Sequence, residues 1–110
     1  MAIVEVDEEN FKESLEEAFK ESQTVILKFG SEYCEPCHAL EAELEELEEE
    51  MENLSILFID TDESPELVEK YDIFTLPTMI IYDSNQTIIY HKEGIILAED
   101  IAKIINSKEK

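Results

Sequence analysis

The chain has 110 residues, enough for one domain with a single core, and 44% of them are hydrophobic. Twenty-nine acidic residues stand against eight lysines, so the formal net charge is −21. This charge argues against binding to nucleic acid or to an anionic membrane, because both depend on basic patches. No apolar stretch is long enough to span a membrane, and the N-terminus lacks the pattern of a signal peptide. We therefore expect one cytoplasmic, monomeric domain over residues 1–110, whose charge supplies solubility or selects basic-rimmed partners.

Segments of strand and helix type alternate along the first half of the chain. Residues 3–6 and 24–29 are short apolar runs, and we predict a strand for each. Between them, apolar residues recur at helical spacing after Asp7, the candidate N-cap of the first helix. A glutamate-rich helix is predicted from Cys34, with one apolar stripe formed by Leu40, Leu44, Leu47 and Met51.

The second half continues this alternation. Residues 55–60 predict a third strand, and Ser64, followed by a proline, predicts the cap of a short helix. The runs 78–82 and 87–90 flank four turn-forming residues, which indicates a hairpin. The last helix covers about residues 98–106 and is expected to bury Ile101, Ile104 and Ile105. The order βαβαβαββα predicts an α/β fold in which a mixed central sheet carries helices on both faces.

The two cysteines of the chain, Cys34 and Cys37, enclose Glu35 and Pro36 at the start of the predicted long helix. The first turn of a helix leaves backbone N–H groups unpaired and carries a partial positive charge, so a thiol there ionises more easily. The thiolate is the attacking species in disulfide exchange, and a second thiol at this spacing can resolve the mixed disulfide. The pattern therefore favours a redox-active dithiol.

The spacing of this cysteine pair also fits three other uses. A structural zinc site normally needs four ligands, and the only histidines are His38, adjacent to Cys37, and His91. The cysteine pair followed by His38 also matches the haem-attachment pattern, which is typical of exported, largely helical chains. A purely structural disulfide across so small a loop would remove little chain entropy from the unfolded state. Each of these is less favoured than the redox role, and no cofactor or metal is expected.

Two separate motifs resemble those of the thioredoxin family. Residues 29–38, which read F-G-S-E-Y-C-E-P-C-H, resemble the family's F-W-A-x-W-C-G-P-C-K. Some forty residues further on, Leu76-Pro77-Thr78 resembles the family's I-P-T. The resemblance covers nearly the whole chain and implies the thioredoxin fold.

The resemblance also implies roles for individual residues. Cys34 corresponds to the nucleophile and Cys37 to the resolving thiol. Pro77 corresponds to a proline that is cis in the family and lies beside the dithiol, where an incoming peptide can add to the preceding backbone like a strand. The implied substrate-binding residues are Tyr33, Glu35, Pro36, Leu76, Pro77 and Gly94.

The chain departs from the family pattern at several of these positions. Lys28 stands where the family usually carries a buried aspartate that assists proton transfer; it either reaches solvent, pairs with an acid, or serves as a proton relay that tunes the thiols. Glu35 replaces a glycine between the cysteines and opposes thiolate formation. Gly30 and Tyr33 replace two tryptophans, which removes aromatic surface from the groove. Because Lys28 and Glu35 act in opposite directions, the sequence does not give the sign of any change in redox potential.

These observations predict a thiol–disulfide oxidoreductase that reduces protein disulfides through Cys34 and Cys37. The resemblance implies that its electrons come from a flavin-dependent thioredoxin reductase. The alternative is a redox sensor or protein-binding module that has the same fold but does not turn over, and a third interpretation is an oxidant that inserts disulfides.

Overall fold

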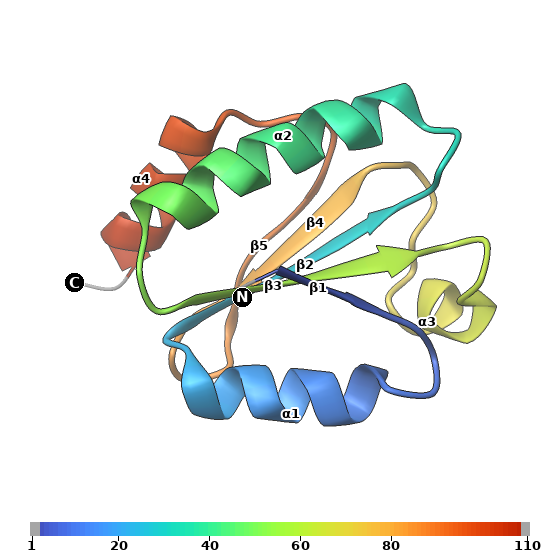
Figure 1. Ribbon diagram of the computed structural model, residues 1–110, viewed down its shortest axis with the longest axis horizontal. Helices are drawn as coiled ribbons and strands as arrows, with labels where there is room; N and C mark the ends of the chain where they lie inside the picture. The colour runs from blue at the N-terminus through green and yellow to red at the C-terminus, as the bar shows by residue number, and fades with distance from the viewer. Residues whose placement is uncertain (1–2, 109–110) are drawn as a thin grey trace.

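The computed structural model describes residues 3–108, and its elements follow the predicted order (Figure 1). The strands are β1 (Ile3–Val6), β2 (Thr24–Gly30), β3 (Leu54–Asp60), β4 (Thr78–Tyr82) and β5 (Ile88–Glu93). The helices are α1 (Phe11–Glu21), α2 (Glu35–Glu50), α3 (Pro65–Lys70) and α4 (Ala98–Lys108). None of the helices within residues 3–108 has the length and apolarity needed to cross a membrane.

The five strands form one mixed sheet in the order β1-β3-β2-β4-β5. Strands β1, β3 and β2 are parallel. Strand β4 runs antiparallel to β2, and β5 runs antiparallel to β4. This confirms the α/β class with a mixed sheet. It also places β2, which leads into the cysteine pair, at the centre of the sheet, where all seven of its residues are buried.

Helices cover both faces of the sheet, as Figure 1 shows with α1 below it and α2 above it. One core cluster joins α1 and α3 to the sheet, and the other joins α2 and α4 to the opposite face. Because side chains alternate along a strand, Val25, Leu27 and Phe29 of β2 pack on the α1 side, whereas Ile26 packs on the α2 side. Lys28 is two residues after Ile26 on the strand, so its side chain points to the same face, toward α2.

Tyr71, which follows α3, ties that helix to the sheet near the end of β2. Its ring lies 5.9 Å from that of Phe11 and 5.6 Å from that of Phe29. Burial, and then the nearby hydroxyl of Tyr82, raise the pKa of Tyr71 well above its usual value. Tyr71 is therefore an uncharged packing residue at physiological pH.

The expected N-cap of the first helix is wrong. α1 begins at Phe11 with Asn10 as its cap residue, four residues after β1 ends. Asp7 instead accepts hydrogen bonds from the backbone N–H groups of Glu9 and Asn10, both at 3.0 Å, within the turn that precedes the helix. Aspartate suits such turns as well as caps, and the sequence pattern does not separate the two uses.

The later elements differ from their predicted bounds in two places. The strand expected at residues 87–90 is β5, which runs from Ile88 to Glu93, and the hairpin itself is confirmed. The last helix extends to Lys108; Ile101 and Ile105 are buried in it as predicted, but Ile104 is only partly buried. As an edge strand, β5 exposes much of both faces and so lacks the apolar alternation that marks its inner neighbours.

Ser64 precedes α3 as predicted, but its side chain makes no cap hydrogen bond. It is fully buried, and within residues 3–108 its Oγ has no hydrogen-bond partner. We expect Ser64→Ala to leave the free energy of unfolding unchanged or to raise it by up to about 1 kcal/mol, because a buried unpaired hydroxyl is unfavourable. Chemical denaturation measures the change, and a loss of more than about 1 kcal/mol would mean that the hydroxyl is paired in solution.

Candidate active site

Cys34 and Cys37 form a disulfide at the start of α2. Cys34 is the N-cap residue of that helix, with extended backbone angles, and Pro36 lies in its first turn, where a missing N–H costs no hydrogen bond. The Cys34 Sγ accepts a hydrogen bond from the Cys37 backbone N–H at 3.2 Å. The same N–H also donates to the Cys34 carbonyl oxygen at 3.1 Å, so the helix directs a shared backbone donor and its positive end at the sulfur of Cys34.

The two sulfur-bearing residues differ in their access to solvent. Cys34 is partly exposed, whereas Cys37, in the first turn of α2, is completely buried. Cys34 therefore lies on the outer side of the pair, and Cys37 lies one helical turn further in.

The segment 76–78 lies beside the disulfide because of the strand register. Thr78 and Phe29 form the last pair of the antiparallel β2–β4 ladder, so Pro77, the residue before Thr78, lies near the end of β2, which leads into the cysteine pair. The Leu76–Pro77 peptide bond is cis, as the resemblance implied. The Pro77 carbonyl accepts a hydrogen bond of 2.9 Å from the Gly94 N–H, which brings the third predicted binding segment to the same place.

The predicted binding residues therefore come from three segments that meet around the disulfide, and several of them are open to a partner. Tyr33 is 85% exposed, and Glu35 and Pro36 are exposed on the first turn of α2. Leu76 is partly buried against the core, and within residues 3–108 its backbone N–H and C=O have no hydrogen-bond partner. Gly94 has a φ of 97°, a left-handed conformation that favours glycine.

Lys28 is buried, with a relative exposure of 3%, on the α2 side of β2. Its ammonium forms an ion pair with the Glu41 carboxylate of α2 and lies 4.4 Å from the centroid of the Phe58 ring. A buried ammonium without a partner would be strongly destabilising, so the pair accounts for a lysine at this depth. The predicted pairing with an acid is confirmed, and the alternative in which Lys28 reaches solvent is wrong.

Gly30 explains how Lys28 comes close to the disulfide. A Cβ atom placed on Gly30 would stand 3.0 Å from the Lys28 Nζ and 3.1 Å from the Cys37 Sγ, so these two atoms are at most about 6 Å apart. Because Gly30 has no side chain, the space between the Lys28 Nζ and the Cys37 Sγ is left open.

Gly30 and Lys28 also line a hollow of about 780 Å³ that opens between β1, β2 and α2, which we call the acidic hollow. Its lining includes Glu5, Asp7, Glu32, Glu41, Glu45, Asp60 and Glu63.

Two residues of this region were missed by the sequence analysis. Glu41 follows Cys37 by four residues and therefore shares its helix face, a spacing that the sequence does contain. Phe74 is 86% exposed on the segment that leads to Leu76, and an aromatic side chain so open to solvent is unusual. The sequence contains no clear signal for Phe74, because its neighbours Ile73 and Leu76 are also apolar.

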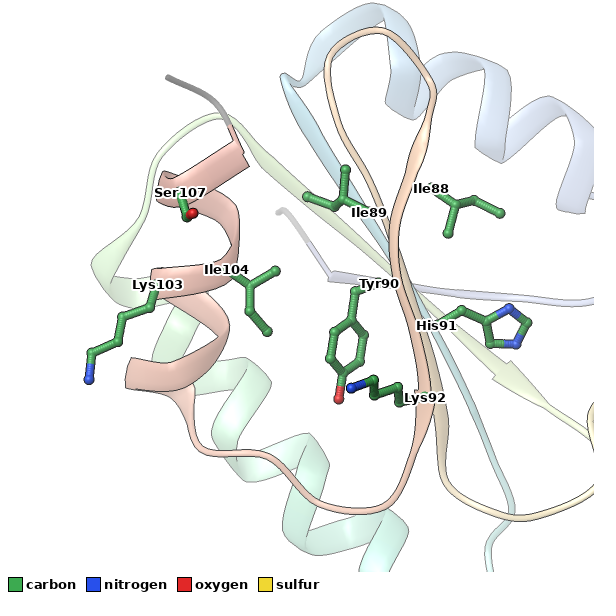
Figure 2. Close-up of a pocket in the computed structure, with 8 residues that line it drawn as sticks. All are labelled: Ile88, Ile89, Tyr90, His91, Lys92, Lys103, Ile104 and Ser107. Carbon is green, nitrogen blue, oxygen red and sulfur yellow. The ribbon is translucent and has the colours of Figure 1, made fainter.

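A second cavity, of about 670 Å³, lies between β5 and α4. Figure 2 shows Ile89, Tyr90 and Lys92 on the side of β5 that faces α4, with Ile88 and His91 on the other side of the strand. Burial raises the pKa of Tyr90 here. No cysteine lines this cavity, and α4 lies beside the later turns of α2 in Figure 1, away from the start of that helix. The thiol chemistry therefore belongs to the start of α2.

Comparison with known proteins agrees with this geometry. The thioredoxin family model matches residues 2–107. The chain belongs to the thioredoxin family. It is 34% identical to thioredoxin of Chlamydia trachomatis serovar D over 104 residues, which are 94% of this chain and 96% of that protein. It is also 34% identical to thioredoxin H5 of Oryza sativa subsp. japonica over 82 residues, which are 74% of this chain but only 61% of that protein.

A solved structure of chloroplastic thioredoxin z superimposes with a TM-score of 0.87 at 28% identity, covering 99% of this chain and 96% of that one. This confirms the thioredoxin fold. With its paired cysteines, the chain is a thiol–disulfide oxidoreductase of the protein-disulfide reductase type. Thioredoxins act on proteins that contain disulfides and are reduced in turn by thioredoxin reductase.

Proposed function

We propose that Cys34 is the sulfur that attacks the substrate disulfide and that Cys37 resolves the mixed disulfide. The observation that carries this assignment is the contrast at the start of α2: Cys34 is partly exposed and its sulfur accepts the Cys37 N–H, while Cys37 is fully buried. Only the outer sulfur can meet a second protein, and the backbone donors stabilise a negative charge on that sulfur.

The substrate chain binds beside the disulfide in an extended conformation. The free backbone groups of Leu76, next to Pro77, are the hydrogen-bonding partners that such a chain needs. Tyr33, with Glu35 and Pro36, flanks it on one side, and Gly94 on the other. Lys28 tunes the thiols from below through its charge.

The direction of reaction follows from its partners. Electrons reach the dithiol from a thioredoxin reductase-like donor and pass to protein disulfides in the cytoplasm, where reducing conditions favour a catalytic use of paired cysteines. The chain acts as a single domain and as a monomer. In this role it links electron transport to the thiol balance of the cell.

Reduction of insulin in the presence of dithiothreitol tests the function. A disulfide reductase shortens the lag before the freed insulin chains precipitate, in proportion to its concentration. A redox sensor or binding module with the same fold would leave the lag unchanged, and that result would contradict the proposal.

The acidity around the site predicts a preference for basic substrates. Glu32 and Glu35 are exposed on either side of Cys34, so a positively charged disulfide peptide should be attracted and a negatively charged one repelled. The rate constant with the basic peptide should fall by roughly tenfold between low and high salt, as screening removes the attraction. Stopped-flow measurement of peptide reduction at several salt concentrations checks this.

A matched pair of double variants locates the effect. Glu32→Gln with Glu35→Gln should lower the ratio of the basic-peptide rate to the acidic-peptide rate by several-fold. The same loss of charge at Glu49 and Glu50, exposed at the far end of α2, should change the ratio much less. Equal changes in the two double variants would mean that net charge alone governs the preference.

A further inference from the structure

The Lys28 ammonium lies between two groups that can carry a negative charge. One is the Glu41 carboxylate, with which it pairs, and the other is the Cys37 sulfur, across the gap left by Gly30. In the disulfide form the Cys37 sulfur is uncharged, so among residues 3–108 only the Glu41 carboxylate pairs with the ammonium. When Cys37 loses its proton, two anions compete for one buried cation.

Glu41 is well placed for this competition. It lies four residues after Cys37 on α2, so the two side chains leave the helix on the same face. Its side chain is 29% exposed, whereas that of Lys28 is 4% exposed. The carboxylate can therefore be hydrated when the ammonium turns away from it, but the ammonium cannot be hydrated without a partner.

We propose that Glu41 is a positioning residue for the resolving step: as the counter-ion of Lys28 it competes with the Cys37 thiolate for the ammonium and so sets the pH at which Cys37 attacks. This inference rests on the proposed roles of the two cysteines. In this proposal Lys28 and Glu41 have opposite effects: Lys28 favours ionisation of Cys37 to the thiolate, and Glu41 disfavours it.

The step itself balances as a thiol–disulfide exchange. In the mixed disulfide, Cys34 is bonded to the substrate sulfur and Cys37 carries a thiol, whose proton is released to solvent. The Cys37 thiolate then attacks the Cys34 Sγ, forming the Cys34–Cys37 bond while the bond from Cys34 to the substrate breaks. The substrate sulfur leaves with the electron pair and is protonated from solvent.

Other ionisable groups face the same hollow and contribute to the field at Cys37. They are Glu5 and Asp7 from β1 and the turn after it, Glu32 before the cysteines, His38 and Glu45 on α2, Asp60 at the end of β3, and Glu63 in the loop that follows. The His38 Nδ1 lies 3.8 Å from the Glu41 Oε1. Glu45 is the matched control for Glu41, because it lines the same hollow from the next turn of the same helix and has no ion pair with Lys28.

Stopped-flow reaction of the reduced protein with a small amount of 5,5′-dithiobis(2-nitrobenzoate) separates the two steps. The first thionitrobenzoate is released by attack of Cys34, in a phase that depends on concentration. The second is released by Cys37 within the same molecule, in a phase that does not. The pH midpoint of the second phase reports the ionisation of Cys37 in the mixed disulfide.

We expect Lys28→Met to raise this midpoint and Glu41→Gln to lower it, each by about one pH unit, the size expected for a charge within 4–6 Å. Glu45→Gln should give a much smaller change. In the Lys28→Met background, Glu41→Gln should have almost no further effect, because its influence passes through the ammonium. Circular dichroism confirms that each variant is folded before its kinetics are compared.

Three results would overturn the proposal. The first is a midpoint in Glu41→Gln that is unchanged or raised. The second is an equal change of the midpoint in Glu45→Gln. The third is an equal lowering by Glu41→Gln in the wild-type and Lys28→Met backgrounds. A wild-type protein with no second phase would instead contradict the proposed resolving role of Cys37. The two failures are therefore distinct.

Discussion

Cys34→Ser is expected to reduce disulfide reduction to the uncatalysed rate, whereas Cys37→Ser should retain the first attack and accumulate mixed disulfides with its substrates. The reason is that the two cysteines at the start of α2 act in different steps: the partly exposed Cys34 attacks the substrate, and the buried Cys37 then releases the product. Insulin reduction measures the first effect. Non-reducing electrophoresis with mass spectrometry, after incubation with a disulfide-containing protein, measures the second.

The two serine variants also control for each other. Both remove one sulfur and abolish the disulfide, so a general effect of losing that bond would appear equally in both. Full activity of Cys34→Ser would show that Cys34 is not the nucleophile, and trapping by Cys34→Ser instead of Cys37→Ser would show that the roles are reversed.

Leu44→Ala is expected to lower the free energy of unfolding by about 2–5 kcal/mol, the usual cost of a cavity left by a fully buried leucine. Leu44 is 0% exposed in the core cluster that joins α2 and α4 to the sheet. Urea denaturation of the oxidised protein measures the change. Because α2 carries both cysteines, the experiment also shows how strongly the sheet holds the helix that presents them.

Glu46→Ala is the matched control on the same helix. Glu46 is exposed two residues further along, and a surface substitution away from caps and ion pairs usually changes stability by less than about 0.5 kcal/mol. A similar loss in the two variants would mean that helix propensity, and not packing against the sheet, limits the stability of α2.

Much of the fold could be predicted because the inner elements have strong local patterns. The central strand β2 is apolar along almost its whole length, and the stripe of Leu40, Leu44 and Leu47 repeats at helical spacing, so both were placed within a residue or two. Local patterns failed where one residue type serves two purposes. Asp7 and Ser64 are both good cap residues by type, but the path of the chain places one in a turn and buries the other.

The candidate site divides in the same way. Cys34, Cys37 and Pro77 could be found because their motifs are local in sequence. The partner of Lys28 could not be identified, because the contact depends on how far along β2 the helix α2 lies. The gap at Gly30 is likewise a property of two elements packed together, and the sequence shows only that a large side chain is missing.

The most direct test of the central claim is alkylation of the reduced protein with less than one equivalent of iodoacetamide near neutral pH, followed by peptide mass spectrometry. The account predicts that the label is found almost entirely on Cys34, because its sulfur is accessible and is stabilised as a thiolate by the start of α2. Labelling of Cys37 first, or of both residues equally, would contradict the assignment of Cys34 as the attacking sulfur.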